Sequence, residues 1–446
     1  MTRQQLKGWG MTAPTTADVV SVQIADDARS ALAAAGPRGL LARGLGRSYG
    51  DAGQNAGGTV LDMTSFDAIL DVDSDARTMR VQAGLSLDAL LRAALVRGWW
   101  VPVLPGTRQV TIGGAIAADV HGKNHHVDGS FGQHVRSLSL LLASDDVVEV
   151  TPDDALFWAT VGGMGLTGVV LEATLELKPV ETSWFVVDTD RTPQLRTLMD
   201  VLAEGEPHHP YSVAWFDTAT RGDSLGRGVV TQGRAARLDE LPLARRDTAL
   251  ELAAPDFGSL PVTPPIGFVN GLTARAFNEL WFRKAPQHRR DELQDVTQFF
   301  HPLDIIGDWN RVYGPRGFCQ YQCVVPFGAE DALVAVVDAI AASRHVSSLN
   351  VLKRFGPGNA SPLSFPMPGW TLAVDLPVRR GLDDLLTALD RIVLDSGGRL
   401  YLAKDSRMSA TDFAAMYPRL DDFRAIRAEV DPFGLLRSDL ARRLEL

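Results

Sequence analysis

The chain has very little cysteine. Its two cysteines, Cys319 and Cys323, lie in the segment GFCQYQCVVPF, whose β-branched and aromatic content predicts a strand. At about 3.3 Å per residue their Cα atoms would lie roughly 13 Å apart, beyond the reach of a disulfide. We therefore expect two core thiols, and the chain offers no cysteine and histidine spacing typical of a metal site.

Long hydrophobic runs are missing too. No stretch reaches about 18 uncharged apolar residues, so no segment is expected to span a membrane. The first twenty residues carry Arg3 and Lys7 with no apolar run after them, so the sequence contains no recognisable secretory leader.

An excess of positive charge is also absent. The 44 basic and 54 acidic residues give a net charge of −10, which argues against a broad contact with phosphate backbones, so we do not expect nucleic acid as a partner. The length of 446 residues instead suggests a globular protein of two or three domains.

The order of predicted elements indicates an α+β protein. Residues 1–182 alternate short strands with small-residue helices, such as SLDALLRAALVRG, which should end at Gly98. Residues 183–398 supply a second set of strands and two long helices, typical of an antiparallel sheet covered on one side. Residues 399–446 are helical and rich in arginine, and we expect them to return to the first domain.

A proline-rich stretch within the second domain breaks this regularity. Residues 241–271 have no steady period, which predicts a long loop or lid that is mobile without ligand. The helix expected after it carries Phe277, Leu280, Trp281 and Phe282. Core packing is the favoured interpretation of this apolar face, and contact with lipid is the alternative.

Three glycine-rich stretches are candidates for a cofactor site. The literal GxGxxG at residues 163–168 precedes strand periodicity, which excludes the strand-to-helix context of a nicotinamide fold. The loop ARGLGRSYGD, residues 42–51, can bring backbone close to a phosphate-bearing ligand. In residues 104–129, Gly113 and Gly114 open a small-residue helix whose first amides could hold an anion.

These stretches also carry a resemblance. RGLGRSYGD, PGTRQVTIGGAIAADVHGKN and FWATVGGMGLTGVV, in this order, resemble the FAD-binding half of the vanillyl-alcohol-oxidase-like flavoproteins. FHPLDIIGDWNRVYG, LSFPMPGW, AKDSR and SDLARRLEL resemble, more closely, the decaprenylphosphoryl-β-D-ribose 2-oxidases of mycobacteria and their relatives. The resemblance covers nearly the whole chain. It implies a two-domain FAD-linked oxidase with a PCMH-type FAD-binding domain and an antiparallel-sheet substrate domain.

The motifs and the resemblance together assign a cofactor site. Many relatives place a histidine at the position of Arg47 and attach the flavin to it covalently, so we expect FAD to be bound non-covalently here. The expected contacts to FAD are Gly44, Gly46, Arg47, Ser48, Tyr49, Gly50, Gly106, Thr107, Gly113, Gly114, His121, Gly122, Val169 and Tyr401.

The chemistry of sugar oxidation selects further residues. Removing a hydride and a proton from a hydroxyl group requires a proton acceptor and positive charge near the flavin, and Lys404 and His121 are the catalytic candidates. Gln320 and Gln322 share one face of their predicted strand, where sugar hydroxyls would satisfy both amides. The other expected substrate contacts are Tyr49, Lys123, Tyr313, Lys353, Thr371 and Ala373.

Ala373 marks a departure from the family. Relatives carry a cysteine at this position, facing the flavin pocket, to which nitroaromatic inhibitors attach. Strand alternation should place Thr371, Ala373 and Asp375 on one face, although Ala373 could instead merely pack under the sheet.

The resemblance also implies a reaction and partners. The expected activity is oxidation of the 2-hydroxyl of a polyprenyl-phosphoryl ribofuranose to the 2-keto sugar, the first half of its epimerisation to arabinose for cell-wall arabinan. A short-chain reductase would complete the epimerisation, and contact with the inner membrane would be peripheral, on the periplasmic side or, since no leader is visible, on the cytoplasmic side. Two alternatives are an oxidase of a soluble alditol or aldonolactone and a flavoprotein without enzymatic activity.

Overall fold

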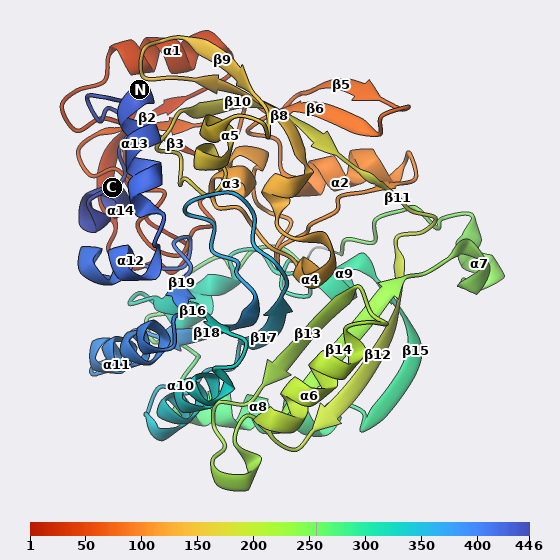
Figure 1. Cartoon of the computed structure of the whole chain (residues 1–446). Coiled ribbons are helices and arrows are strands. Elements are labelled where there is room, and N and C mark those ends of the chain that lie inside the picture. The colour runs from red at the N-terminus through yellow and green to blue at the C-terminus, as the bar shows by residue number, and fades with distance from the viewer. Residues whose placement is uncertain (256) are drawn as a thin grey trace.

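Two small sheets build the N-terminal part of the chain. In the computed structural model, which describes residues 1–255 and 257–446, the first sheet has the order β1-β2-β4-β3 and the second, antiparallel sheet the order β5-β6-β10-β8-β9 (Figure 1). The strands are β1 (Thr2–Leu6), β2 (Thr15–Ser21), β3 (Leu40–Arg43), β4 (Thr59–Asp62), β5 (Ile69–Asp73), β6 (Thr78–Gln82), β8 (Val135–Leu141), β9 (Val147–Val150) and β10 (Val169–Glu176). The helices are α1 (Ala25–Ala33), α2 (Leu87–Leu95), α3 (Ile112–Ala117), α4 (His125–Asp128) and α5 (Ala155–Thr160).

Helix α2 forms as its sequence predicts. The Ser86 hydroxyl accepts a hydrogen bond from the Ala89 amide at 3.1 Å and caps the first turn. The apolar positions are buried, and the chain turns away at Gly98, whose φ of +69° suits glycine. The GxGxxG stretch lies after α5 and before β10, so a helix precedes it and a strand follows, the reverse of a dinucleotide-binding turn.

An eight-stranded antiparallel sheet forms the second part. Its order is β15-β12-β14-β13-β17-β18-β16-β19, and α6, α10 and α11 cover one of its faces (Figure 1), which confirms the prediction. The strands are β12 (Trp184–Thr192), β13 (Tyr211–Phe216), β14 (Gly228–Ala235), β15 (His288–Asp295), β16 (Phe318–Pro326), β17 (Asn350–Phe355), β18 (Gly369–Pro377) and β19 (Arg399–Leu400). The helices are α6 (Leu195–Gly205), α10 (Glu330–Ala342) and α11 (Leu382–Asp395). The short strands β7 (Trp99–Trp100) and β11 (Lys178–Pro179) pair at the junction of the two parts.

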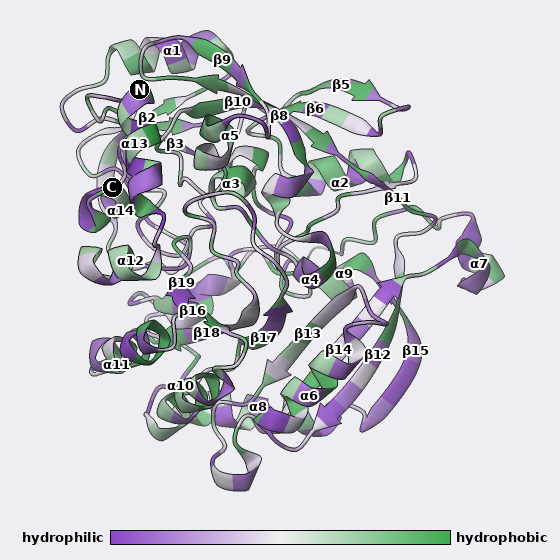
Figure 2. Ribbon diagram, in the orientation of Figure 1, coloured by the Kyte–Doolittle hydropathy of each residue, from purple (hydrophilic) through white to green (hydrophobic). Residues whose placement is uncertain are grey.

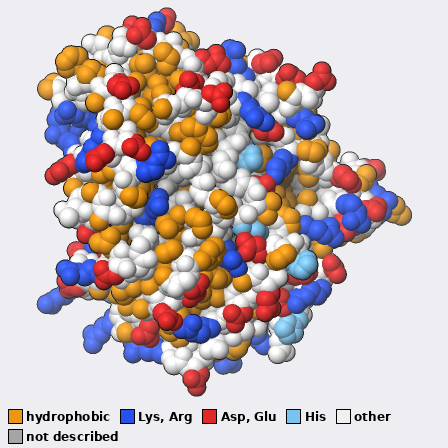
Figure 3. All heavy atoms as spheres, in the orientation of Figure 1, with side chains coloured by type: hydrophobic (Ala, Val, Ile, Leu, Met, Phe, Trp, Pro, Cys, Tyr) orange, Lys and Arg blue, Asp and Glu red, His pale blue; other side chains and the backbone are white. Residues whose placement is uncertain are grey.

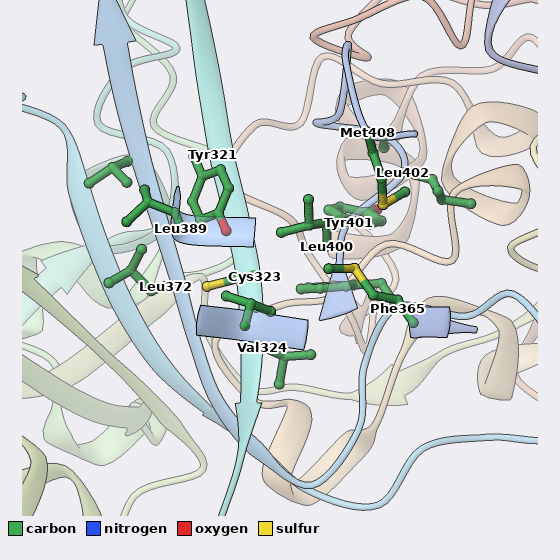
Figure 4. Packing of buried hydrophobic residues seen from close by; sticks show 14 of the residues in the cluster. Tyr321, Cys323, Val324, Phe365, Leu372, Leu389, Leu400, Tyr401, Leu402 and Met408 are labelled. Atoms are coloured by element: carbon green, nitrogen blue, oxygen red, sulfur yellow. The ribbon is translucent and has the colours of Figure 1, made fainter. Parts of the chain in front are cut away.

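The two faces of β16 have different surroundings, and one of them packs into the hydrophobic core beneath the sheet. Tyr321 and Cys323 are buried among apolar side chains such as Leu372 and Leu389 (Figure 4). Both cysteines are free, as predicted, and Cys319 packs at the margin of the same cluster. The opposite face of β16 therefore remains available for polar side chains.

The last helices lie against the first part of the chain. Helices α12 (Ala410–Met416), α13 (Leu420–Val430) and α14 (Asp439–Leu444) neighbour the N-terminal strands (Figure 1). Leu436 is fully buried in a cluster with Val22 and Leu40. The two N-terminal sheets are thus completed by residues from the opposite end of the sequence, although the first two residues of the 399–446 segment still pair with β16 as β19.

Residues 241–284 differ from the expectation. Helix α8 (Gly271–Lys284) forms, but it buries Ala274 and Asn278, whereas Phe277, Leu280 and Trp281 are exposed. The favoured interpretation of core packing is therefore wrong for these three side chains. The described part of residues 241–270 contains the short helix α7 (Leu243–Arg246) and an isolated bridge between Ser259 and Gly307, and residue 256 lies outside the described part. Helix α9 (Val296–Phe300) follows β15.

Two surface properties complete the architecture. Among the described residues, no helix combines the length and the apolar character needed to cross a bilayer. Basic and acidic side chains are interspersed over the face drawn in Figure 3, so that face carries no broad field of one sign. The edge strand β15 is hydrophilic along most of its length (Figure 2).

Candidate active site

A cavity of about 940 Å³ lies between the uncovered face of the large sheet and loops of the N-terminal part. Alternation along the strands selects the side chains that face it, and the intervening side chains enter the core beneath the helices. The polar and small residues of the sheet wall are Gln320 and Gln322 of β16, Lys353 of β17, and Thr371 and Ala373 of β18. Ala373 thus lies on the cavity wall and not under the sheet.

The loop after β3 forms the opposite wall. Leu45, Gly46, Arg47 and Ser48 line the cavity, and among the described residues none of their backbone amides donates a hydrogen bond to the protein. Successive unengaged amides around a residue of positive φ, here Gly46 at +66°, suit a phosphate group. The loop is anchored beyond this point, because the Tyr49 amide donates to Ala403 O at 2.9 Å.

Helix α3 does not offer the anion site expected of its first turn. The Ile112 and Gly113 amides donate to Leu85 O and Ala83 O at 2.8 Å. The Gly114 amide donates to the Thr111 hydroxyl at 3.2 Å. The prediction of a helix-start cradle is therefore wrong, and the glycines serve close packing: a Cβ on Gly113 would lie 3.1 Å from that of Ala83.

Arg47 occupies the position where the resemblance expects a flavin-linking histidine. Its guanidinium lies over the Trp9 ring at 3.9 Å, and its buried Nε has no hydrogen-bond partner among the described residues. Burial lowers the pKa of Arg47, and Asp304 and Asp308 oppose that shift. The arginine remains a cation at the cavity wall.

Three lysines, Lys123, Lys353 and Lys404, also reach the cavity and are half-buried because they line it. Burial lowers the pKa of Lys123 and Lys404 to about 7 and that of Lys353 to about 8. Lys404 Nζ lies 3.9 Å from the centre of the Tyr49 ring. Lys123 Nζ donates to Phe299 O and lies over the Phe299 ring, which leaves it less free than the other two.

His121 joins the two walls of the cavity. Its Nε2 lies 2.9 Å from Gln322 Nε2, and its Nδ1 lies 3.3 Å from Lys353 Nζ. Burial first, and then the positive charge of Lys353, lower the pKa of His121 well below its usual range. The imidazole is therefore neutral at physiological pH.

A buried carboxyl group stands behind Gln320. Gln320 Nε2 donates to Asp375 Oδ1 at 2.5 Å, and the Tyr313 hydroxyl lies 3.5 Å from Oδ2. Burial raises the pKa of Asp375 to about 7, while Gln320 and Lys404 oppose that shift. Because Asp375 occupies the Gln320 amide nitrogen, the Gln320 carbonyl oxygen is left to accept hydrogen bonds from a ligand.

The structure brings most of the predicted site residues to one cavity. Gly44, Gly46, Arg47, Ser48, Tyr49, Gly106, Thr107, Gly114, His121, Gly122, Lys123, Gln320, Gln322, Lys353, Thr371, Ala373, Tyr401 and Lys404 line it. Four predicted residues lie behind the wall: Gly50, Gly113, Val169 and Tyr313. Val169 is buried with Leu141 in an apolar cluster, and Tyr313 stacks on Phe318 at 4.0 Å.

Several aromatic residues that line the cavity were not predicted from the sequence. Trp9, Trp215, Phe299, Phe300 and Trp309 line the cavity. Trp9, Trp215 and Phe299 lie on segments with no quoted motif, whereas Phe300 and Trp309 belong to the quoted FHPLDIIGDWNRVYG motif but were not singled out. Asp304, which accepts from the Arg108 amide at 2.8 Å, lies in the quoted FHPLDIIGDWN motif and could have been singled out.

One edge of the cavity continues into exposed apolar surface, which we call the apolar rim. Phe277, Trp281 and Leu303 line the cavity and are also exposed to solvent. The amides of Phe257, Leu260 and Phe268 donate to carbonyl groups of the 305–312 segment. The side chains of residues 257–268 therefore lie beside that segment. The apolar rim consists of Phe257, Val262, Ile266, Phe268, Leu272, Phe277, Leu280, Trp281, Leu303 and Ile306.

Comparison with protein families matches two parts of the chain. Residues 17–151 match the FAD binding domain model, and residues 331–444 match the model of D-arabinono-1,4-lactone oxidase. The first match contains the loop with unengaged amides, and the second contains Lys353, Ala373 and Lys404. Both matched parts contribute residues to the cavity, and the segment between them supplies others such as Trp215, Gln320 and Gln322.

Similar proteins extend over the whole chain. Decaprenylphosphoryl-beta-D-ribose oxidase of Mycolicibacterium smegmatis is 51% identical and covers 100% of this chain and 98% of its own length. Alditol oxidase of a Streptomyces species is 27% identical over 91% of this chain and 90% of its own. L-Gulono-1,4-lactone dehydrogenase of Mycobacterium tuberculosis is 24% identical over 93% and 92%.

Proposed function

Because this chain belongs to the decaprenylphosphoryl-β-D-ribose oxidase family of FAD-dependent oxidoreductases, we propose that it oxidises the 2-hydroxyl of decaprenylphosphoryl-β-D-ribofuranose to the 2-keto sugar. This is the first half of an epimerisation that yields the arabinose donor for cell-wall arabinan. One observation carries the choice of a lipid-linked substrate: the cavity that holds Lys353, Lys404 and Gln320 opens onto the apolar rim.

The residues present fit FAD. The amides of residues 45–48 would bind its pyrophosphate, and the small residues Gly106, Gly114 and Ala117 would let its ring system approach the backbone. When bound, FAD supplies the acceptor for the hydride that leaves the sugar. Arg47 offers no atom for the histidyl linkage known from relatives, so the proposed binding is non-covalent.

Side chains of the cavity would stabilise charge, bind the sugar and position one another. Lys404 would hold positive charge beside the cofactor, and negative charge arriving there raises the pKa of a lysine and keeps it protonated. Gln320 presents its carbonyl oxygen and would accept a hydrogen bond from a sugar hydroxyl. His121 would bridge Gln322 and Lys353 at the sheet wall through its two ring nitrogens.

The apolar rim is the proposed exit for the polyprenyl chain. A phosphodiester at the cavity mouth could pair with the unengaged Arg47, and the chain would then leave over Trp281, Leu303 and their neighbours. We propose that the same surface makes the protein's contact with the inner membrane peripheral, on the periplasmic side by family resemblance. A short-chain reductase is the proposed partner, because the 2-keto product must be reduced to give the epimer.

Anaerobic reduction of the purified holoenzyme tests this function. Decaprenylphosphoryl-ribose should bleach the bound FAD, and the product should be its 2-keto form by mass spectrometry. Xylitol and L-gulono-1,4-lactone at equal concentration serve as the matched soluble substrates. Faster bleaching by either of them would overturn the proposal in favour of a soluble-sugar oxidase, and absence of bleaching by all three would exclude it.

A further inference from the structure

The hydroxyl group of Thr371 fixes the orientation of its neighbour on the sheet wall. Thr371 Oγ1 lies 3.0 Å from Cys323 O, and since a carbonyl oxygen only accepts, the single hydroxyl proton is directed there. Oγ1 must therefore accept the hydrogen bond that it shares with Gln322 at 3.3 Å. Only the amide nitrogen of Gln322 can donate it.

This orientation determines the tautomer of His121. The same Gln322 Nε2 lies 2.9 Å from His121 Nε2, and an amide nitrogen donates but does not accept. The lone pair of the neutral ring is therefore at Nε2, and its one proton is at Nδ1. The hydroxyl of Thr371, which never touches the ring, thus decides which ring nitrogen carries the proton.

The tautomer in turn determines the state of Lys353. His121 Nδ1 lies 3.3 Å from Lys353 Nζ, and an ammonium group there would bring N–H against N–H. An amine can accept from Nδ1, and the surroundings favour one. His121, His125, Lys123 and Lys404 face Lys353, and no described carboxylate forms an ion pair with it. Burial also lowers the pKa of Lys353, which favours the uncharged amine.

We propose that Lys353 is the uncharged base that takes the proton of the substrate hydroxyl, with Thr371 and Gln322 as positioning residues. The contact to His121 is long, so rotation about Cε–Nζ can turn the lone pair toward a hydroxyl in the cavity. The O–H bond breaks and its proton converts the amine to an ammonium, while the C–H bond breaks and its hydride leaves for FAD as the C=O bond forms. The proton returns to solvent after turnover. The assignment of the substrate rests on the proposed function, but the tautomer and the amine do not.

The tautomer is measured by ¹⁵N NMR of the histidine-labelled holoenzyme, with the His121 signals identified by their loss in His121→Asn. At pH 9, above the pKa of about 8 of Lys353, the wild type should show protonated Nδ1 and unprotonated Nε2. Thr371→Val should shift the populations toward protonated Nε2, because Gln322 is then free to turn. Thr192→Val, which removes a hydroxyl bonded to Gly228 O on β14, is the matched control and should leave the His121 signals unchanged. Protonated Nε2 or an imidazolium in the wild type would overturn the proposal.

The base is tested by the rate of flavin reduction under anaerobic conditions. Lys353→Met should slow reduction by ~10²–10⁴-fold, the range for a lost general base, and abolish the rise of the rate with pH between 6 and about 9. Lys353→Met should also keep the Nδ1–H tautomer, because Gln322 sets it. A rate within threefold of wild type, or an unchanged pH profile, would remove Lys353 from the mechanism. If the lipid-linked ribose fails to reduce even the wild type, the proposed function fails while the NMR result still decides the tautomer.

Discussion

At the scale of single residues, Lys404 illustrates how position gives an ordinary side chain a chemical role. Its Nζ makes no hydrogen bond to the described protein and rests on the Tyr49 ring at the cavity wall. Lys404→Ala should therefore leave the fold and FAD content largely intact but slow flavin reduction by ~10²–10⁴-fold. Stopped-flow absorbance measures the rate, and the exposed Lys7→Ala should match wild type. Reduction of Lys404→Ala at the wild-type rate would exclude a role in the reaction.

Ala373 gives the cavity wall a methyl group, which cannot react as a thiol would. It lies beside Lys353 and Thr371 on the wall, at the position where the family resemblance leads one to expect a cysteine. Ala373→Cys should oxidise substrate at close to the wild-type rate and, during turnover with a nitroaromatic inhibitor, form an adduct that mass spectrometry maps to residue 373. The unmodified protein serves as the control. An adduct on its Cys319 or Cys323, or an active variant with none at residue 373, would mean that the wall is oriented differently.

Asp375 should make stability depend on pH. Burial raises the pKa of its carboxyl from 3.8 to about 7, so between these values the folded chain holds a proton that the unfolded chain releases. This group therefore contributes stability at low pH that is lost as pH rises toward 7. Asp375→Asn should raise the thermal midpoint relative to wild type more at pH 7.5 than at pH 5, by calorimetry. An equal difference at both values would contradict the raised pKa.

At the scale of elements, periodicity predicted those strands that have one apolar face. In β16 and β18, alternate residues enter the core and the cavity wall as their sequences indicate. Strand β15, HRRDELQD, has almost no apolar residues and was not predicted. It lies at the sheet edge and pairs only with β12, where backbone hydrogen bonds suffice and charge discourages further pairing.

Site residues that belong to a sequence motif could be predicted. Whether a backbone amide is free to bind a ligand could not be predicted, because that depends on its hydrogen-bond partners. The loop at Gly44–Tyr49 and the lysine of AKDSR both reach the cavity. The anion site at α3 was wrong because Thr111, Ala83 and Leu85 satisfy its first amides, and the last two come from another segment of the chain. Hydrogen-bond partners that are distant in sequence leave no local pattern.

Helix α8 combines regular helical structure with an exposed apolar face, which should bind lipid. Phe277 and Trp281 stack at 5.9 Å between the cavity and the outer surface. Phe277→Ser with Trp281→Ser should lower co-sedimentation with vesicles of anionic phospholipid at least severalfold, because apolar surface leaves the interface. The control Val96→Ser changes an exposed apolar residue just after α2. Equal losses in both variants, or none in the α8 variant, would remove α8 from the membrane contact.

At the scale of the whole molecule, both halves of the chain line the cavity proposed for FAD, and we expect FAD to bind there without a covalent bond. Arg47 has no nucleophilic ring nitrogen, so heat or acid denaturation should release all FAD in intact form. Fluorescence of the supernatant after precipitation measures the released FAD, and the emission rise after phosphodiesterase treatment identifies it as FAD. Flavin fluorescence that stays with the washed protein pellet would show a covalent link through another residue.

The C-terminal helices also set an order of events during synthesis. Leu436 fills the core around Leu40, and Arg443 pairs with Asp51, beside the cofactor loop, and with Asp405, beside Lys404. Leu40 and Asp51 are synthesised long before Leu436 and Arg443, so the N-terminal sheets cannot be completed while these later residues are still inside the ribosome. The nascent chain should therefore remain partly folded, and the site proposed for FAD should be completed only after Leu436 and Arg443 have emerged.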